Sequence, residues 1–338
     1  MNKKRVLAML LAGAMALSMT ACGGNSASTD DSSNDGGASA SSGSYKVSVI
    51  LKTLAAEYWQ YVKSGAEDYA SEHSDKVTVE VKGPSSETAF DEMQNMIETD
   101  LSSGSYDGVI ISPLQSDTAA QLVSGTKLPI VAIDTNFTAP EVKSFVGTGN
   151  EAAAKKGGEA AVEAAKAAGW TDIKCIEIAG VQGDQTNTAR MNGYKAGVEE
   201  AGGTFLSDEV QYADATADRA TTAMEAIMQT HPEGIAIICA NNDDMAMAAA
   251  RAAQGHDAYK NTIFLGFNGD RAACEAILAG QMTMSVAQMA YEMGYKAVET
   301  MVQVLDGETV DEFVDSGSDV VTPDNAQERL DTLKTQLH

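Results

Sequence analysis

The stretch GIAIICANNDDMAMAAARAAQ, residues 234–254, holds the pattern that decides the fold. Its first part, Gly234–Cys239, is rich in isoleucine and predicts a short buried strand, whereas the alanine-rich Met245–Gln254 predicts a helix. Polar residues, including Asn241 and Asn242, separate the two. A strand followed closely by a helix is the unit from which parallel sheets with crossover helices are built.

The same alternation continues along the chain on both sides of this stretch. We expect further strands and helices at the following ranges. The strands are Lys46–Leu51, Val77–Val81, Gly108–Ile111, Pro129–Ile133, Ile173–Ile178, Thr262–Phe267 and Met282–Ala287. The helices are Glu57–His73, Glu87–Ser103, Glu151–Ala168, Thr188–Ala201, Thr216–Thr230 and Tyr291–Leu305. The pattern predicts an α/β fold of doubly wound, Rossmann-like sheets, in which ligands bind beyond the carboxyl ends of the strands.

Length and charge set limits on organisation and partners. The chain has 338 residues, more than a usual single domain, so two packed lobes are expected. It carries 23 Lys and Arg residues against 48 Asp and Glu. An acidic surface repels phosphate backbones, and nucleic acid is therefore not expected as a partner.

The amino terminus has the pattern of a secretory signal. Three basic residues at positions 3–5 precede the apolar run Val6–Met19, which is too short to span a bilayer, where about 20 residues are needed. The segment Met19–Cys22 resembles the lipobox of bacterial lipoproteins. That resemblance implies cleavage of residues 1–21 and lipidation of Cys22, which places the protein on the outer face of the cytoplasmic membrane, or in a periplasm if the envelope has two membranes.

A tether is expected between this anchor and the fold. Gly23–Ser44 contains only small and polar residues, without an aromatic or branched aliphatic side chain that could be buried. Such a composition does not compensate the entropy lost on ordering, so residues 22–44 are interpreted as the lipidated cysteine and a flexible linker. Folding is expected to start near Tyr45.

Polar side chains follow several of the expected strands. They are Asp134, Asn241, Asn242, Asn268 and Gln288. Amide and carboxylate groups can serve neighbouring hydroxyls as donors or acceptors, as a polyol removed from water requires. Taken singly, such residues are more often turn or helix caps. Their recurrence at equivalent strand ends favours a ligand-binding rim.

Two aromatic residues, Tyr58 and Trp59, follow the first expected strand. A flat aromatic face suits the apolar C–H face of a sugar ring. Core packing is the alternative interpretation of an aromatic pair at the start of a helix.

These residues resemble the sugar-binding family typified by ribose-binding protein, the type I periplasmic binding proteins, over nearly all of Tyr45–Gln327. The motifs that carry the resemblance are Lys52-Thr53-Leu54 through Tyr58-Trp59, Pro129–Asp134, Arg190–Tyr194, Asn242–Ala246, Gly266–Gly269 and Val286–Gln288. The resemblance implies that Tyr58 and Trp59 stack on the ligand ring. It also implies that Asp134, Asn242 and Gln288 bind hydroxyls.

The chain departs from the family pattern at four positions. Asn268 stands where the family commonly has Asp, so one acceptor has become a group that also donates. Thr135 and Thr188 stand where the ribose binder has arginines, and Ala56 replaces an asparagine. Ribose itself is therefore not the expected ligand.

Other polar groups are candidates to compensate for these losses. They are Lys52, Asp184 and Gln185, with Thr188 at the altered position also kept as a candidate ligand-binding residue. A lysine at the end of the first strand also resembles rhamnose binders and receptors for furanoid quorum signals. Arg190 is expected to anchor its helix rather than to touch ligand.

The family resemblance implies two lobes joined by a three-strand hinge. The amino-terminal lobe is expected at residues 45–147 plus 289–317 and the other at 148–288 plus 318–338, with crossovers near Thr148, Met289 and Ser318. Closure of the lobes around a small solute would strengthen each hydrogen bond by excluding water. The expected function is capture of a monosaccharide or similar polyol and delivery to an ABC transporter permease; the alternative is a receptor for a furanoid signal or sugar feeding a sensory system.

No catalytic or metal chemistry is expected. The sequence has neither a Gly-x-Ser-x-Gly elbow nor His spacing suited to a metal, so we expect no enzyme activity and no cofactor. A sugar-responsive transcription regulator would need a DNA-binding head, where this chain has a signal segment. Cys175, Cys239 and Cys274 are interpreted as structural, and the acidic Asp311–Asp319 as a solvated turn. A monomer is expected.

Overall fold

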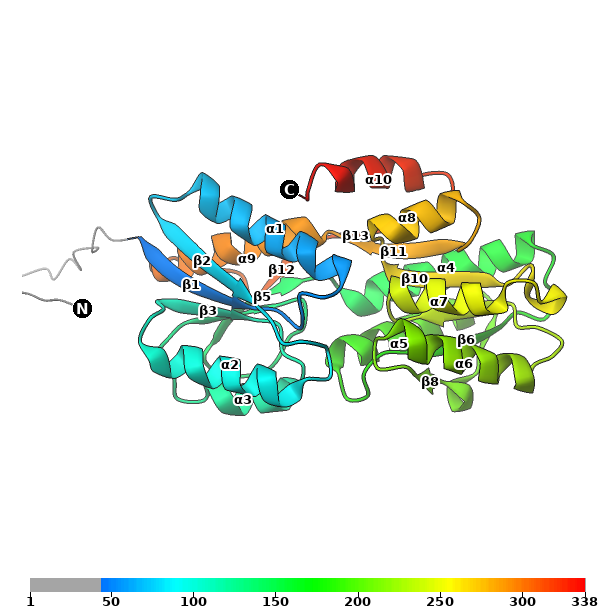
Figure 1. Ribbon diagram of the computed structural model, residues 1–338, viewed down its shortest axis with the longest axis horizontal. Helices are drawn as coiled ribbons and strands as arrows, with labels where there is room; N and C mark the ends of the chain where they lie inside the picture. The colour runs from blue at the N-terminus through cyan, green and yellow to red at the C-terminus, as the bar shows by residue number, and fades with distance from the viewer. Residues whose placement is uncertain (1–43, 338) are drawn as a thin grey trace, which may run out of the picture. The chain divides into compact units, whose positions relative to one another are not determined.

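The computed structural model describes residues 44–337, so the signal segment, Cys22 and nearly all of the tether lie outside the described residues. Its strands form two separate sheets (Figure 1). The first sheet has the order β12-β5-β4-β3-β1-β2, and all its strand pairs are parallel. Its strands are β1 (Tyr45–Ile50), β2 (Val77–Lys82), β3 (Gly108–Ile111), β4 (Ile130–Ile133), β5 (Val142–Gly147) and β12 (Phe313–Asp315).

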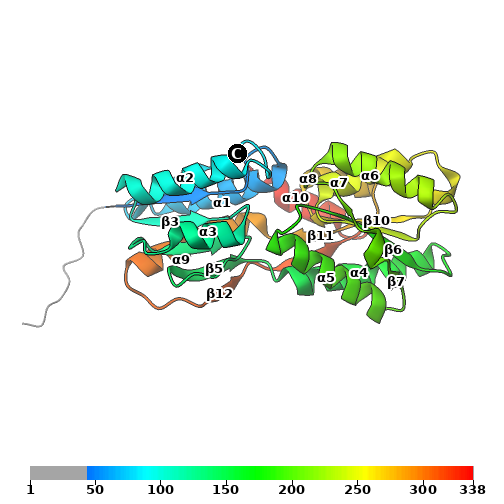
Figure 2. The ribbon, with the colours of Figure 1, turned by 90° about the horizontal axis from the view of Figure 1, so that it is seen from below.

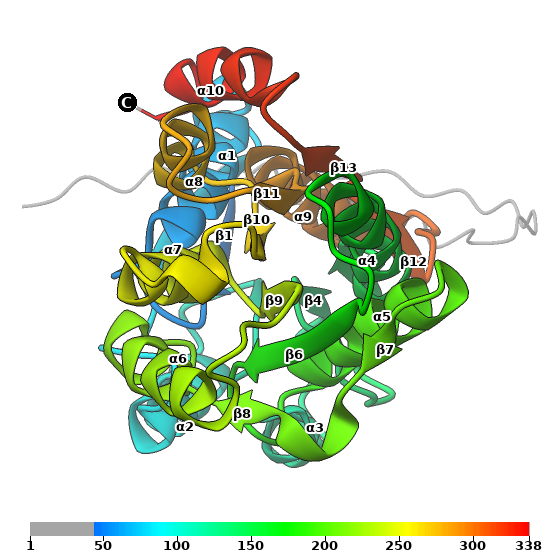
Figure 3. The ribbon, with the colours of Figure 1, turned by 90° about the vertical axis from the view of Figure 1, so that its right-hand side faces the viewer.

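The second sheet has the order β13-β11-β10-β9-β6-β7, with the short β8 also paired to β6. It is parallel except for β13, which runs antiparallel to β11. Figure 3 looks along this half of the molecule, with the strands enclosed by helices. The strands are β6 (Lys174–Ala179), β7 (Thr204–Phe205), β8 (Gln211–Tyr212), β9 (Ile237–Ala240), β10 (Ile263–Asn268), β11 (Met284–Gln288) and β13 (Ser318–Val321).

Helices cover both faces of each sheet (Figures 1 and 2). The helices at the first sheet are α1 (Glu57–Glu72), α2 (Phe90–Ser103), α3 (Ser116–Val123) and α9 (Ala290–Leu305). Those at the second are α4 (Asn150–Ala167), α5 (Gln185–Glu200), α6 (Ala217–Thr230), α7 (Asp243–Ala253) and α8 (Arg271–Leu278), and α10 (Ala326–Lys334) packs against α8. Two single-turn 3₁₀ helices, Ser207–Glu209 and Asp257–Tyr259, complete the elements. The predicted α/β class with doubly wound sheets is confirmed.

The chain passes between the two sheets at three places. It leaves the first sheet after Gly147, the last residue of β5, and enters α4 of the second. It returns after Gln288, the last residue of β11, into α9, which packs on β3, β4 and β5. It crosses a third time between β12 and β13. The polypeptide thus winds through both sheets, and neither is built from one continuous segment.

The central strands form because continuous apolar runs can be buried on both faces of a parallel sheet. β3, β4 and β9 are buried along their whole length, as expected for such strands. Strand β5 is only half buried along its length, and its neighbour β12, at the edge of the sheet, is largely exposed. Their sequence signal is correspondingly weaker, and the prediction missed them.

Four corrections to the predicted elements follow from the structure. Asp311–Asp319, predicted as a solvated turn, contains β12 and the start of β13, because each finds a partner strand from a distant part of the chain. The helix predicted to begin at Glu87 begins at Phe90, which leaves Glu87 in the preceding loop. The short helices α3 and α10 were not predicted, whereas Cys274 lies early in a helix, α8, as expected.

Helices α1 and α9 approach each other backbone to backbone through two glycines. A Cβ atom on Gly65 would lie 1.9 Å from the Tyr291 carbonyl oxygen, and one on Gly294 would lie 1.9 Å from the Val62 carbonyl oxygen. A larger side chain at either position would therefore force the two helices apart. This contact fixes α9, which follows a chain crossing, onto the first sheet.

Among residues 44–337, no helix has the length and apolar character needed to span a bilayer.

Candidate functional site

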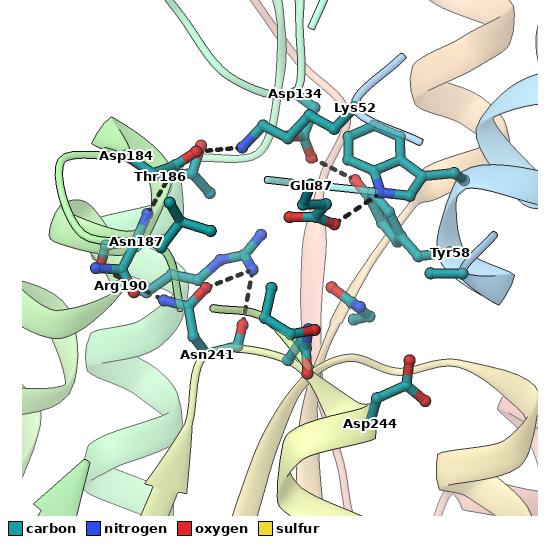
Figure 4. A pocket seen from close by; sticks show the side chains of 16 residues that line it. Lys52, Tyr58, Glu87, Asp134, Asp184, Thr186, Asn187, Arg190, Asn241 and Asp244 are labelled. Atoms are coloured by element: carbon teal, nitrogen blue, oxygen red, sulfur yellow. Dashed lines mark hydrogen bonds and ion pairs between the residues drawn. The ribbon is translucent and has the colours of Figure 1, made fainter. Parts of the chain in front are cut away.

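A polar cavity lies beyond the carboxyl ends of strands from both sheets (Figure 4). Its volume is about 40 Å³, which accommodates only a few water molecules at about 10–15 Å³ each. The residues on the side of the first sheet are Lys52, Ala56, Tyr58, Trp59, Glu87 and Asp134. Those on the side of the second are Val181, Asp184, Thr186, Asn187, Arg190, Ala215, Asn241, Asn242, Asp244 and Asn268.

Strand ends explain why these side chains meet. Lys52 follows β1 by two residues, Asp134 directly follows β4, and Asn268 is the last residue of β10. In open parallel sheets this edge is where ligands bind, because the connecting loops diverge there and leave a crevice.

The backbone around the cavity is strained at three of its lining residues. Asp134 has φ of 62°, Ala215 of 58° and Asn268 of 133°, all in a region that residues with a side chain rarely adopt. Asp214, beside Ala215, has φ of 47°. These four are the non-glycine residues with positive φ within the described part of the chain. Such strain costs about 1–3 kcal/mol per residue and concentrates at ligand sites, where it aims side chains into the site.

Two direct contacts join the two sides of the cavity. The Lys52 Nζ donates a short hydrogen bond to Asp184 Oδ2, and both side chains are buried. The hydroxyls of Thr135 and Thr186 are 2.6 Å apart and also buried. Burial lowers the pKa of Lys52, but the nearby carboxylates of Asp184, Asp134 and Glu87 together raise it by more, so the ammonium stays charged. These two buried contacts, an ion pair and a neutral hydrogen bond, add to the more exposed ion pair between Arg271 of α8 and Glu57 of α1, at 3.3 Å.

The aromatic pair presents its polar atoms to carboxylates. The Tyr58 hydroxyl donates to Asp134 Oδ1 at 2.8 Å, and the Trp59 indole nitrogen donates to Glu87 Oε1 at 3.1 Å. The two rings are nearly perpendicular, at 79° with centroids 4.9 Å apart. A flat ligand ring can therefore stack on only one of them at a time. Burial, followed by the nearby Asp134, raises the pKa of Tyr58 well above its ordinary value, so the phenol remains protonated.

Arg190 lines the cavity and is held by bonds to the first residue of α4 and to the loop after β9. Its Nε donates to Asn150 Oδ1 and its Nη1 to the Asn241 carbonyl oxygen, each at 2.8 Å. The guanidinium also stacks over the Phe267 ring at 3.9 Å. Arg190 therefore anchors its helix, as predicted, but it also lines the cavity, which the prediction did not expect.

Carboxylates outnumber cations among the lining residues. Glu87, Asp134, Asp184 and Asp244 face the two cations Lys52 and Arg190. Burial raises the pKa of Glu87 and of Asp244 above the ordinary values. The cavity is thus rich in hydrogen-bond acceptors and is better suited to hydroxyl donors than to an anion.

Two of the lining residues also cap helices. Asp184 accepts a hydrogen bond from the Asn187 backbone at 2.8 Å at the start of α5, and Asn242 accepts one from the Met245 backbone at 2.9 Å at the start of α7. The cap interpretation of such residues is therefore correct for both, and it does not compete with their position in the cavity. A residue at the start of a helix that follows a strand can cap the helix and line the cavity at the same time.

Most of the predicted site residues lie at this cavity. Lys52, Tyr58, Trp59, Asp134, Asp184, Asn242 and Asn268 line it. Gln185 and Thr188 are exposed on α5 and are not among the lining residues. Gln288 is fully buried behind the cavity wall, where its amide donates to Asn268 Oδ1 at 3.0 Å. Gln288 therefore positions Asn268 in this structure and does not face the cavity.

The prediction did not include several lining residues. Asn241 was recognised at a strand end, but Glu87, Thr186, Asn187 and Asp244 were not singled out. A signal for Glu87 exists, since it lies in the loop after β2, at the same sheet edge as Lys52. The incorrect helix start at Glu87 concealed it.

Two further features of the described chain concern chemistry other than hydroxyl binding. Within residues 44–337 no three His, Cys, Asp or Glu side chains come together in a group suited to a metal ion. Cys175, Cys239 and Cys274 are all buried. The residues that line the cavity present hydrogen-bonding groups and aromatic faces, which are the parts of a binding site.

Comparison with known proteins agrees with this geometry. The model of the periplasmic binding protein domain family matches residues 47–309. The D-allose-binding periplasmic protein of Escherichia coli (strain K12) is 30% identical over 264 residues, which are 75% of this chain and 82% of that protein. Ribose import binding protein RbsB of the same strain is 27% identical over 268 residues, 78% of this chain and 86% of that protein.

Solved structures show the same fold. An ABC transporter solute-binding protein from Agrobacterium vitis with bound D-fucose aligns with a TM-score of 0.76 and 23% identity, covering 87% of this chain and all of that chain. A carbohydrate transporter solute-binding protein from Agrobacterium radiobacter in complex with D-arabinose aligns with a TM-score of 0.78 and 23% identity, covering 88% of this chain and all of that chain.

The chain belongs to the periplasmic binding protein family. The predicted resemblance to type I binding proteins is confirmed, and the chain is a solute-binding protein of the kind that serves importers outside the cytoplasm.

Proposed function

We propose that this protein captures a monosaccharide or a similar polyol and delivers it to the permease of an ABC importer. The observation that carries the proposal is the cavity at the carboxyl ends of both sheets, lined by carboxylates, amides and two aromatic rings. The names of the relatives, which bind allose and ribose, support a sugar as the ligand class.

The lining groups match the needs of a polyol. Asp134, Glu87 and Asp244 supply acceptors for hydroxyl protons, and Arg190 supplies a fixed donor. The amides of Asn241 and Asn268 can accept or donate. Because Asn268 also donates to Asp270 Oδ2 at 3.3 Å, its oxygen is oriented by its neighbours rather than free to rotate.

Ligand binding in this proposal requires the two sides of the cavity to move apart and close again. The cavity is far smaller than the roughly 300 Å³ or more of typical ligand pockets. We propose that the lobes, residues 45–147 plus 289–317 and residues 148–288 plus 318–338, rotate about the three crossovers near Thr148, Met289 and Ser318. A ligand hydroxyl would then replace the direct Lys52–Asp184 contact with bonds to both partners.

A lipid anchor is part of the same proposal. The lipobox at Met19–Cys22 supports lipidation of Cys22, with the protein held at the outer face of the cytoplasmic membrane and acting as a monomer. Mass spectrometry of the membrane-extracted protein should show diacylglycerol on Cys22 as the first residue. In a Cys22→Ala chain the protein should lose its membrane association, and retention on the membrane would contradict the anchor.

A thermal-shift screen against aldoses, deoxysugars, inositols and furanoid signal compounds tests the ligand class. A ligand present at about 100 times its dissociation constant should stabilise the protein by roughly 2.7 kcal/mol. Asp134→Asn should abolish the shift, since it replaces an acceptor by a donor while an Asn tolerates the positive φ. Asp208→Asn, at an exposed residue away from the cavity, is the matched control.

A second candidate function is a receptor for a furanoid signal or sugar feeding a sensory system. The buried Lys52 in the cavity favours it, since a lysine at this position resembles receptors for furanoid signals. A shift with furanoid compounds alone would support this receptor. No shift with any sugar, polyol or furanoid compound would overturn both candidates.

A further inference from the structure

Two cysteine sulfur atoms meet in the core of the second sheet, outside the binding site. Cys175 lies in β6 and Cys239 in the adjacent strand β9, and the two Sγ atoms are 2.8 Å apart. Carbon atoms not bonded to each other pack best at about 3.5–4.0 Å, and sulfur is larger than carbon. The two sulfurs are therefore closer than ordinary packing requires.

The strand register explains why the two side chains converge. Cys175 is paired with Ile237, and Cys239 is paired with Glu177, so the cysteines are diagonal neighbours on adjacent parallel strands. Residues two apart on a strand share a face, which places both side chains on the same face of the sheet. A disulfide has an S–S length of about 2.0 Å, which is about 0.8 Å shorter than this separation.

We propose that Cys175 and Cys239 form a disulfide that links β6 to β9. The proposal requires export of the protein, because disulfides form and persist in extracytoplasmic compartments. Membership of the periplasmic binding protein family supports export. It does not depend on which ligand the cavity takes. The third cysteine of the described chain, Cys274, lies on α8 and has a bond only to the Gly269 carbonyl oxygen, at 3.9 Å.

The oxidant in this proposal is a disulfide, either a low-molecular-weight one or that of an envelope thiol oxidoreductase. One cysteine thiolate attacks a sulfur of the oxidant RSSR, which forms a mixed disulfide and releases RS⁻. The second thiolate attacks the protein sulfur of the mixed disulfide, which forms the Cys175–Cys239 bond and releases the second RS⁻. The two cysteines lose two protons and two electrons, and the oxidant gains them as two RSH.

This exchange takes place before the lobe has finished packing. Both sulfurs are fully buried in the folded chain, and burial, together with the neighbouring Cys175, raises the pKa of the Cys239 thiol well above its ordinary value. Buried thiols of this kind react slowly. A chain that folds after export exposes both cysteines to oxidant first, and folding then brings the correct pair together.

The test compares the full chain secreted into an oxidising periplasm with the same chain made in a reducing cytosol. Each sample is denatured in excess N-ethylmaleimide, digested with trypsin without reduction, and analysed by mass spectrometry. Trypsin places the three cysteines in separate peptides, residues 175–190, 220–251 and 272–296. The secreted protein should give the first two peptides joined by a disulfide, with Cys274 alkylated.

Two cysteine variants, an oxidation of the folded protein and a reduction of the linked protein complete the test. Cys239→Ser should leave Cys175 alkylated in the secreted protein, whereas Cys274→Ser should leave the linked pair unchanged. The folded cytosolic protein, incubated with oxidised glutathione, should stay unlinked for hours, and the linked protein should lose several degrees of melting temperature on reduction. Alkylation of both Cys175 and Cys239 in the secreted protein, or a bond from either one to Cys274, would overturn the proposal.

Discussion

Replacing Glu177 with glutamine should stabilise this protein, and by an amount that depends on pH. Glu177 lies in the central strand β6 and is fully buried, and neither carboxylate oxygen has a hydrogen-bond partner within the described chain. Burial raises its pKa to about 8, although the nearby Arg190 and the Asn241 side chain, which lies close by without completing a hydrogen bond, act in the opposite direction. In the unfolded chain the same group titrates near 4.5.

The sign and the size of the effect follow from this difference in pKa. Between pH 4.5 and 8 the folded state binds more protons at Glu177 than the unfolded state does, so the free energy of unfolding falls as pH rises through this window. Each pKa unit corresponds to about 1.4 kcal/mol. At pH 7 Glu177 is ionised in the unfolded chain and mostly protonated in the folded chain. Relative to a glutamate whose pKa does not change on folding, this difference lowers the free energy of unfolding by about 3 kcal/mol. Glutamine has the same shape and does not ionise.

The assay is unfolding by urea at pH 4.5 and at pH 7, for the parent and for Glu177→Gln. The two proteins should unfold at nearly the same urea concentration at pH 4.5, and the variant should be more stable by about 3 kcal/mol at pH 7. Glu163→Gln, whose side chain is 69% exposed, is the matched control and should change neither value. A variant that gains no stability over the parent between these pH values would refute a neutral Glu177 in the folded state.

Two further substitutions test the contacts that hold the fold together. Lys52→Met should lower the free energy of unfolding by about 3–5 kcal/mol, because it leaves Asp184 buried without its cation. Adding Asp184→Leu should recover much of that loss. Equal stability of the single variant and the parent in urea would show that the ion pair contributes nothing. Gly65→Ala should cost about 3 kcal/mol or more, because its Cβ would meet the Tyr291 carbonyl oxygen. Gly149→Ala, with open space around the added atom, should cost under about 1 kcal/mol, and equal losses in the two variants would contradict the close contact of α1 and α9.

The sequence by itself determined the central strands and the residues at their ends. A continuous apolar run such as Ile130–Ile133 forms a strand that must be buried on both faces of its sheet, and the neighbouring residues alone are enough to show this. The residue after such a run lies at the edge where ligands bind, which is why Asp134 and Asn242 could be assigned to the site. The fold class and the family followed from the same local signals.

The edge strands and the wall of the cavity were decided only by the tertiary structure. β12 and β13 lack a strong local pattern and become strands because β5 and β11 offer them partners. Gln288 also has the right position at a strand end, but its side chain turns to Asn268 and away from the cavity.

The contacts of greatest consequence join residues far apart in the chain. Lys52 and Asp184 are separated by 132 positions, and Cys175 and Cys239 by 64. Local propensity and periodicity depend on residues within a turn of helix or a few positions of a strand, so they cannot indicate contacts between residues this far apart. These pairs form because packing two sheets of one chain against their helices brings distant side chains within bonding distance, and only the folded structure contains that information.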